Sequence, residues 1–255
     1  MKRLVVFVYG VVSYAAFLAS LLYAVGFLGN LVPGSIDSAA DGSVWAALAI
    51  DGGLLALFAL QHSIMARQWF KRGLTRIIPE PAERSTYVLL SSLLLLLLFR
   101  EWRPIGGVIW DAEGTAGEVI LSCTYVTGLL IVLLSTFLIN HFDLFGLRQV
   151  WLYLMGRPYT PLAFRTPFFY RFVRHPLYVG WLLTFWSAPL MTTAHLFFAA
   201  MTTAYILIAI QLEEADLVAM HGETYLQYRK EVPMIVPSMP GVRKDETSGR
   251  IAVAK

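Results

Sequence analysis

Charged residues and cysteine are both scarce in this chain of 255 residues. Asp, Glu, Lys and Arg make up only 15% of it, against about a quarter in an ordinary soluble domain. With 57% hydrophobic residues and a mean hydropathy of +0.63, this composition excludes a soluble globular domain and a disordered chain. The one cysteine, Cys123, excludes an intrachain disulfide and a CxxC metal site, and we expect no bound metal.

Basic tracts are absent too. The net charge is +3, but Lys and Arg lie in short segments between apolar runs, so we expect no nucleic-acid partner. What the chain does have is long apolar runs, which predict one integral membrane domain with the lipid bilayer as its surroundings.

Six apolar runs are candidate membrane spans. The first, residues 4–28, contains no charge and measures about 37 Å as a helix, more than the hydrocarbon core of about 30 Å. The others are residues 44–65, 85–99, 119–139, 177–191 and 196–212. We expect the last two to form a hairpin around residues 192–195, with Pro189 ending or kinking the fifth helix. The predicted fold is an all-α polytopic membrane bundle of about six transmembrane helices.

The distribution of basic residues predicts the orientation of these spans. With six spans, 18 of the 20 Lys and Arg residues fall on one side, and only Arg100 and Arg103 on the other. The positive-inside rule then places both termini in the cytoplasm. We expect the protein in the inner membrane of a bacterium.

Polar and aromatic residues gather at the predicted cytoplasmic ends of the later spans. They occur in NHFDLFGLRQ at 140–149, RHPLYVGW at 174–181, the pair Glu213 and Glu214, and HGETYLQYRKEVP at 221–233. The first segment is equally consistent with an amphipathic helix lying in the membrane interface. Glu213 and Glu214 are harder to explain structurally, because acids at the C-terminal end of a helix oppose its dipole.

These motifs carry a family resemblance. RHPLYVGW, followed by a hairpin, by EE and by HGETYLQYRKEVP, resembles the catalytic region of the isoprenylcysteine carboxyl methyltransferase superfamily over about residues 162–237. QHSIMAR at 61–67, PEPAERSTYVLLSS at 79–92 and NHFDLFGLRQVW at 140–151 resemble a narrower branch, the bacterial methanethiol S-methyltransferases. The same upstream half is similar to NnrU-type membrane proteins, some relatives of which bind haem.

The resemblance implies an S-adenosylmethionine-dependent membrane enzyme that converts methanethiol, a small volatile thiol, to dimethyl sulfide. Together with the apolar runs, it divides the chain into a bundle of four spans at 1–140 and a cofactor-binding catalytic region with a cytosolic-side pocket at 141–237. Residues 238–255 are polar and small, and we expect them to form a disordered tail. The resemblance implies these cofactor-binding residues: Phe164, Arg165, Tyr170, Arg174, His175, Pro176, Leu177, Tyr178, Glu213, Glu214, Tyr225 and Tyr228.

Physical chemistry supports part of this assignment and leaves structural alternatives open. A carboxylate such as Glu213 can bind an ammonium or ribose hydroxyls, and an arginine can pair with a carboxylate in a forked geometry. Arg174 could instead simply extend to the interface and contact anionic lipid. Tyr225 and Tyr228 share a helix face and could only pack the C-terminal helix.

The acceptor needs a group that takes its proton. A thiol is mostly protonated at neutral pH, and an apolar pocket protonates it further unless a base or a cation is near. The candidate catalytic residues are His62, His141 and Asp143. His62 could equally be a neutral contact between helices, although ionisable residues inside spans tend to be functional.

Alternative functions remain at this stage. One is a methyltransferase for an isoprenoid or lipidic thiol or carboxylate. In the prenylcysteine enzymes an arginine one turn before the cofactor glutamate binds the substrate carboxylate, and the matching position here is Ala209, which disfavours a carboxylate acceptor. Another is an NnrU-like haem protein with His62 and His141 as axial ligands. A small transporter is a third, but it has no need for a cytosolic cofactor pocket.

Overall fold

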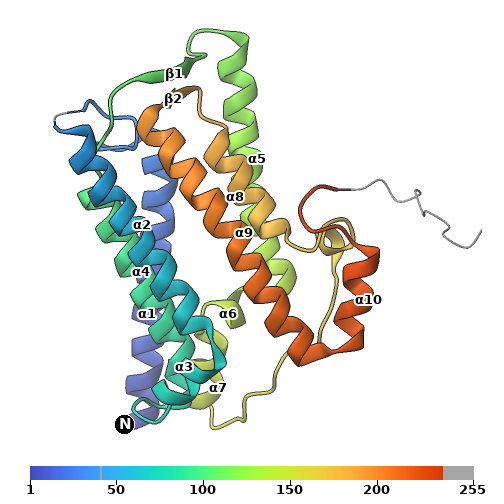
Figure 1. Ribbon diagram of the computed structural model, residues 1–255. Helices are drawn as coiled ribbons and strands as arrows, with labels where there is room; N and C mark the ends of the chain where they lie inside the picture. Colours follow the sequence, from blue (N-terminus) through green and yellow to red (C-terminus); the bar gives the residue numbers. More distant parts are fainter. Residues whose placement is uncertain (41, 238–255) are drawn as a thin grey trace, which may run out of the picture.

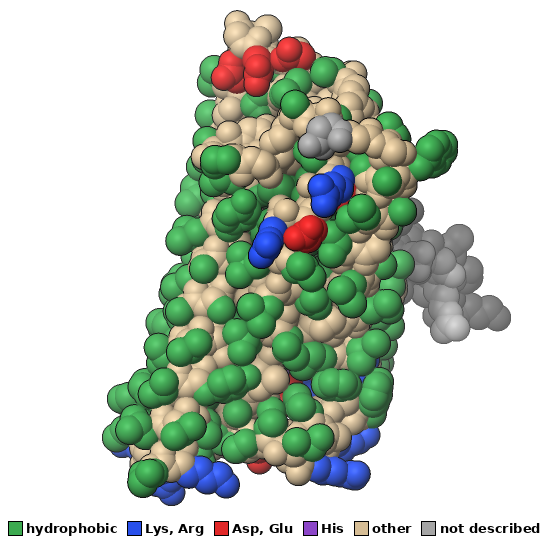
Figure 2. Space-filling view, turned by 90° about the vertical axis from the view of Figure 1, so that its left-hand side faces the viewer, with side chains coloured by type: hydrophobic (Ala, Val, Ile, Leu, Met, Phe, Trp, Pro, Cys, Tyr) green, Lys and Arg blue, Asp and Glu red, His purple; other side chains and the backbone are tan. Residues whose placement is uncertain are grey.

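The computed structural model describes residues 1–40 and 42–237 and is mostly helical (Figure 1). Within those residues, five segments are helical, long and apolar enough to cross a membrane: α1 (Lys2–Leu28), α2 (Val44–Ala66), α4 (Glu83–Glu101) with the preceding turn η1 (Glu80–Ala82), α5 (Ala116–Ile139) and α9 (Thr193–His221). Hydrophobic side chains cover the surface along the bundle, and Lys and Arg gather at its lower end (Figure 2). The prediction of a helical membrane bundle is confirmed.

The count of about six transmembrane helices is not confirmed. The predicted fifth span, residues 177–191, contains a helix of only 11 residues, α8 (Pro176–Trp186), about 16 Å long. Pro189 lacks an N–H and cannot continue the helix. The chain instead becomes extended and forms strand β2 (Leu190–Thr192), which pairs antiparallel with β1 (Val108–Asp111). Neither strand was predicted.

Helix α8 nevertheless runs antiparallel to α9, as expected of the hairpin. The Tyr178 hydroxyl donates to Oε2 of Glu213 over 3.0 Å at one end, and Nε1 of Trp186 donates to Thr203 over 3.0 Å at the other. The β1–β2 pair lies at the top of Figure 1 and α8 begins near the middle of the molecule. The first turn of α8 therefore lies level with Glu213, 20 residues along α9 from its start.

Glycines fix α8 against α5. A Cβ atom built on Gly180 would lie 2.7 Å from the carbonyl oxygen of Gly128 and 2.8 Å from the backbone nitrogen of Val132. A Cβ on Gly128 would lie 2.7 Å from the carbonyl oxygen of Gly180. Only glycine permits this backbone approach, so the start of α8 is held in place by direct contact between main chains.

The upper end of α9 is closed by a buried network that was not predicted. Nδ1 of His195 lies 2.9 Å from Oδ2 of Asp37, and both side chains are 1% exposed. Thr192 donates to Oδ1 of Asp37 over 2.6 Å and Asn30 donates to Oδ2 over 2.8 Å. Nε2 of His195 lies 3.1 Å from the carbonyl oxygen of Phe185. Residues 192–195, predicted only as a connection, thus tie α9 to the end of α8 and to the loop after α1.

Figure 1 places the short helices α3 (Gln68–Leu74) and α7 (Leu147–Leu154) at the lower end, near the N-terminus, with α6 (His141–Leu144) just above them. Helix α10 (Glu223–Glu231) lies higher, beside α9, and the turn η2 (Phe168–Arg171) precedes α8. After α10 the chain turns back to the start of α8, where the N–H groups of Arg174 and His175 donate to the carbonyls of Pro233 and Met234. The predicted tail, residues 238–255, lies outside the described residues.

Candidate active site

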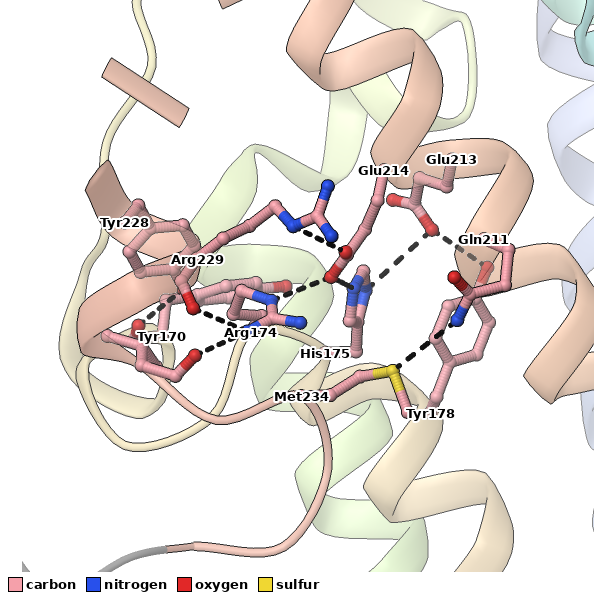
Figure 3. Close-up of polar contacts among 11 residues, drawn as sticks. Tyr170, Arg174, His175, Tyr178, Gln211, Glu213, Glu214, Tyr228, Arg229 and Met234 are labelled. Atoms are coloured by element: carbon pink, nitrogen blue, oxygen red, sulfur yellow. Dashed lines mark hydrogen bonds and ion pairs between the residues drawn. The ribbon is translucent and has the colours of Figure 1, made fainter. Parts of the chain in front are cut away.

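A buried carboxylate, Glu214, joins the start of α8 to α9 and α10 (Figure 3). Its side chain is 4% exposed. Nε of Arg174 lies 2.6 Å and Nε2 of His175 3.1 Å from its Oε1 atom, and Nε of Arg229 lies 3.1 Å from Oε2. Arg174 also donates to the carbonyl oxygen of Arg229. The carboxylate is therefore fully paired, as a buried charge must be.

The neighbouring Glu213 is placed differently. Its side chain is 45% exposed, and Oε2 accepts a hydrogen bond from Tyr178 over 3.0 Å. Nδ1 of His175 lies 3.8 Å from the same oxygen. Figure 3 shows His175 between the two glutamates. Of this pair, only Glu213 keeps a carboxylate oxygen available for a ligand.

Aromatic side chains surround this cluster. The Tyr228 hydroxyl donates to the carbonyl oxygen of Tyr170 over 2.6 Å, which ties α10 to the segment before α8. The Phe164 ring packs against the rings of Tyr225, Tyr228 and His221 at 5.8, 5.5 and 5.1 Å between centroids. Burial raises the pKa of Tyr228 to about 12. Burial, with a smaller contribution from the Glu213 charge, also raises the pKa of Tyr170, so both hydroxyls stay protonated at neutral pH.

The remaining predicted cofactor residues lie around the same place. Pro176 is the first residue of α8 and is buried, and Leu177 follows it and is half-buried. Arg165 is exposed on the segment that carries Phe164. The structure therefore brings most of the predicted residues together, apart from Arg165, for which no partner is seen within the described part of the chain.

His62 lies in a second polar cluster, between α2 and α4. Its Nε2 atom is 2.7 Å from the hydroxyl of Tyr87, and its Nδ1 atom is 3.3 Å from the hydroxyl of Ser91. Ser91 in turn donates to Gln61 over 3.2 Å. The Tyr205 hydroxyl of α9 lies 3.2 Å from that of Ser63. This cluster links α2 to α9 about two helical turns from Glu213.

The other two predicted catalytic residues have structural contacts. Both ring nitrogens of His141 face hydroxyls, Nε2 that of Tyr14 at 2.7 Å and Nδ1 that of Thr136 at 2.9 Å, and burial lowers its pKa. Asp143 pairs with Arg148 at 2.7 Å and accepts from Tyr159 over 3.3 Å. These contacts fix α6 against α1, α5 and the segment after α7.

The two histidines do not form a haem site in this arrangement. His62 contacts α4 and His141 contacts α1 and α5, and each ring nitrogen of both already has a hydroxyl partner. An axial ligand needs a free nitrogen directed at the iron. Among the described residues there is also no group of three or more His, Cys, Asp or Glu that could hold a metal ion.

Several residues of these clusters were not predicted as site residues, among them Arg229, Tyr87 and Tyr205. Arg229 lies in the quoted HGETYLQYRKEVP segment, Tyr87 in PEPAERSTYVLLSS, and Tyr205 inside the last span. The signal for Tyr87 and Tyr205 was their hydroxyls, since a polar atom inside an apolar span needs a partner. The partners themselves are more than 20 residues away in sequence.

Comparison with known proteins gives a consistent answer. The chain is 59% identical over 238 residues to a methanethiol S-methyltransferase of Crocosphaera subtropica, covering 93% of each chain. It is 49% identical to a methanethiol S-methyltransferase of Mycobacterium tuberculosis over 93% of this chain and 98% of that one. It is also 36% identical over 186 residues to Nurim of Pan troglodytes, covering 69% and 70%. Neither a protein-family model nor a solved structure matches it.

Proposed function

Since the chain belongs to the methanethiol S-methyltransferase family, we propose that it transfers a methyl group from S-adenosylmethionine to methanethiol, giving dimethyl sulfide and S-adenosylhomocysteine. The observation that carries this proposal is 46–59% identity to curated enzymes of that name over nearly the whole chain. The expected motifs lie together in space, which supports it independently.

The residues at the start of α8 suit this cofactor. When bound, S-adenosylmethionine supplies an electrophilic methyl group on a cationic sulfur, and it also carries an ammonium and a carboxylate. Glu213 would bind the ammonium or the ribose hydroxyls, with Tyr178 and His175 fixing its orientation. The aromatic group formed by Phe164, Tyr170, Tyr225 and Tyr228 can pack against the adenine and stabilise positive charge.

The network around Glu214 has a different role in this proposal. Because Glu214 is fully paired with Arg174, His175 and Arg229, we assign it and Arg174 to positioning the site. The exposed Arg165 then remains to bind the cofactor's carboxylate. Pro176 and Leu177 line the site through their place at the start of α8.

The interface between α2 and α9 suits a small apolar acceptor. A pocket of about 80 Å³ opens there, lined by Leu55, Phe58 and Ala59 of α2 and by Met201, Thr202 and Tyr205 of α9. This volume suits a molecule of a few non-hydrogen atoms, since one water needs about 10–15 Å³ on the same measure. An isoprenoid chain is far larger, and Ala209, on the same helix, provides no cation for a carboxylate acceptor.

Among the three candidate bases, His62 is the best placed. Its ring centroid lies 5.1 Å from that of Phe58 and 6.5 Å from that of Tyr205, which both line the pocket. His141 and Asp143 are engaged in contacts that fix α6. We therefore assign the base to His62 alone.

The same proposal places the lower end of the molecule in the cytoplasm of a bacterium, with both termini there and the bundle in the inner membrane. The basic residues at this end support the orientation (Figure 2). Residues 1–140 then form the membrane bundle and residues 141–237 the cofactor-binding region.

Headspace gas chromatography tests the function directly. Detergent-purified protein given S-adenosylmethionine and methanethiol is expected to release dimethyl sulfide. Loss of one hydrogen bond to a charged group costs about 1.5–3 kcal/mol, so Glu213→Gln should weaken cofactor affinity about 10- to 100-fold. Glu113→Gln, at an exposed acid of the opposite end, is the matched control. Methylation of a prenylcysteine in place of methanethiol would contradict the proposed acceptor.

A further inference from the structure

The hydrogen bonds around His62 define which of its nitrogens can accept a proton. Ser91 donates its hydroxyl proton to Oε1 of Gln61, so its oxygen is left to accept a hydrogen bond. Nδ1 of His62, 3.3 Å from that oxygen, must then be the protonated nitrogen of the neutral ring. Nε2 is therefore the acceptor, and the Tyr87 hydroxyl donates to it over 2.7 Å.

This arrangement prevents direct contact between a substrate thiol and the basic nitrogen. Nε2 of His62 is occupied by Tyr87, and Nδ1 already carries its proton. The group that a thiol can meet is the Tyr87 oxygen, which still has a free lone pair. Tyr87 lies near the proposed site, because its ring centroid is 5.0 Å from that of His62, which is 6.5 Å from that of the pocket-lining Tyr205.

We propose that Tyr87 relays the proton of the acceptor thiol to His62. The Tyr87 O–H bond breaks as its proton moves to Nε2 of His62, and the S–H bond breaks as the thiol proton moves to the Tyr87 oxygen. The electron pair of the S–H bond stays on sulfur, which uses a lone pair to form the new bond to the methyl carbon. The bond from that carbon to the cofactor's sulfur breaks, and its electron pair stays on that sulfur, so that S-adenosylhomocysteine leaves. Tyr87 ends neutral, the imidazole ends protonated, and no electron is gained or lost overall. This inference rests on the proposed function.

The charged groups around the relay are consistent with this direction of transfer. The Arg84 guanidinium lies 5.0 Å from the centre of the Tyr87 ring, and its Nε atom is held by the carbonyl oxygen of Leu144 at 2.6 Å. A fixed cation there stabilises negative charge on the phenol oxygen during transfer. It also opposes a lasting charge on His62, as burial does, so the imidazole returns its proton between turnovers.

Tyr87→Phe tests the relay, because it removes the hydroxyl and keeps the ring. General base catalysis contributes about 10²- to 10⁴-fold, so kcat with methanethiol should fall by that range at neutral pH. The KM for methanethiol and the affinity for S-adenosylmethionine should stay as in the wild type. The variant depends on the fraction of methanethiol that is already ionised. Its deficit relative to the wild type should therefore shrink about tenfold for each unit by which the pH is raised, up to the thiol pKa. A more acidic small acceptor, 2,2,2-trifluoroethanethiol, is ionised to a greater extent at the same pH, so the deficit of the variant should be smaller with it.

Tyr9→Phe is the matched control. The Tyr9 hydroxyl donates to Thr86, the residue before Tyr87, over 2.9 Å and has no contact with His62, so kcat and its pH profile should not change. An active wild type with unchanged kcat in Tyr87→Phe overturns the relay and leaves the proposed function standing. A deficit that is the same at every pH and for both thiols also overturns it, as a merely structural loss. A wild type that forms no dimethyl sulfide overturns both proposals.

Discussion

Helix α9 carries a buried carboxylate–histidine contact near each end, and the two differ in what lies beside them. At the upper end Asp37 is paired with His195, Thr192 and Asn30. At the lower end Glu214 is paired with His175, Arg174 and Arg229. In both networks, side chains of the protein already pair with both oxygens of the buried carboxylate. Among the described residues, a second acid lies within 4 Å of the histidine only at the lower network, where Oε2 of Glu213, 45% exposed, is 3.8 Å from Nδ1 of His175.

The comparison distinguishes a network with a structural role, at the upper end of α9, from a network next to a candidate binding site, at its lower end. The same residue types close a hairpin at one end and, at the other, hold a second carboxylate where a ligand can reach it. Burial and pairing of a carboxylate therefore do not by themselves indicate function here. The feature that does is an acid left incompletely paired next to a rigid, fully paired neighbour.

The largest effect on stability is expected at the lower network. Glu214→Gln leaves the guanidinium of Arg174, 10% exposed, without its counter-charge, and breaking a buried ion pair in this way costs about 3–5 kcal/mol. Thermal unfolding in detergent measures the loss, with Glu113→Gln as the control. A variant as stable as the wild type would show that the pairing does not hold α8, α9 and α10 together.

A smaller loss is expected at the upper network. Asp37→Asn keeps a carbonyl oxygen for Thr192 but removes the charge that faces His195, and leaving buried polar groups unpaired costs about 1–3 kcal/mol. The affinity for S-adenosylmethionine, measured by calorimetry, should not change. If Asp37→Asn instead weakened S-adenosylmethionine binding and left the unfolding free energy unchanged, the upper network would belong to the binding site. The two ends of α9 would then not differ in role.

The pH dependence of the upper network should be the smallest effect. Burial raises the pKa of Asp37, but the hydrogen bond and charge of His195, with the hydrogen bonds of Thr192 and Asn30, outweigh it and lower the pKa below 3.8. A lowered carboxyl pKa adds stability that is complete above the unfolded value and is lost as the pH falls through the folded value. Below pH 3.8, wild-type protein should therefore lose unfolding free energy more steeply than Asp37→Asn. Parallel curves for the two proteins would contradict this.

The long helices could be predicted from the sequence, because a segment that crosses the lipid bilayer must be a long run of apolar residues. Residues 44–65 and 119–139 agree with α2 and α5 to within three residues at each end. The last span was predicted to stop at residue 212, yet α9 continues to His221. Its charged continuation is stabilised by Arg67, which pairs with Asp216 at 2.9 Å, and by the Glu214 network. Hydropathy cannot detect such pairs.

The sequence predicted which residues form the site, but not which of them face a ligand and which only hold the others in place. The motifs indicated Glu213 and Glu214 together, and only the fold distinguishes the paired acid from the exposed one. The Asp37–His195 contact was out of reach because 158 residues separate the partners. The end of α8 before Pro189 agrees with the prediction for that proline, but strand β2 was missed because it pairs with β1, a segment about 80 residues earlier.

The contact between α5 and α8 also constrains how this protein can evolve. An added methyl group at Gly180 or Gly128 would meet backbone atoms of the other helix, and no exchange of a neighbouring side chain can remove a backbone atom. Second-site suppressors of Gly180→Ala should therefore not arise among the residues around it. A genetic screen for restored dimethyl sulfide production should return mainly true revertants, so that glycine is retained at both positions.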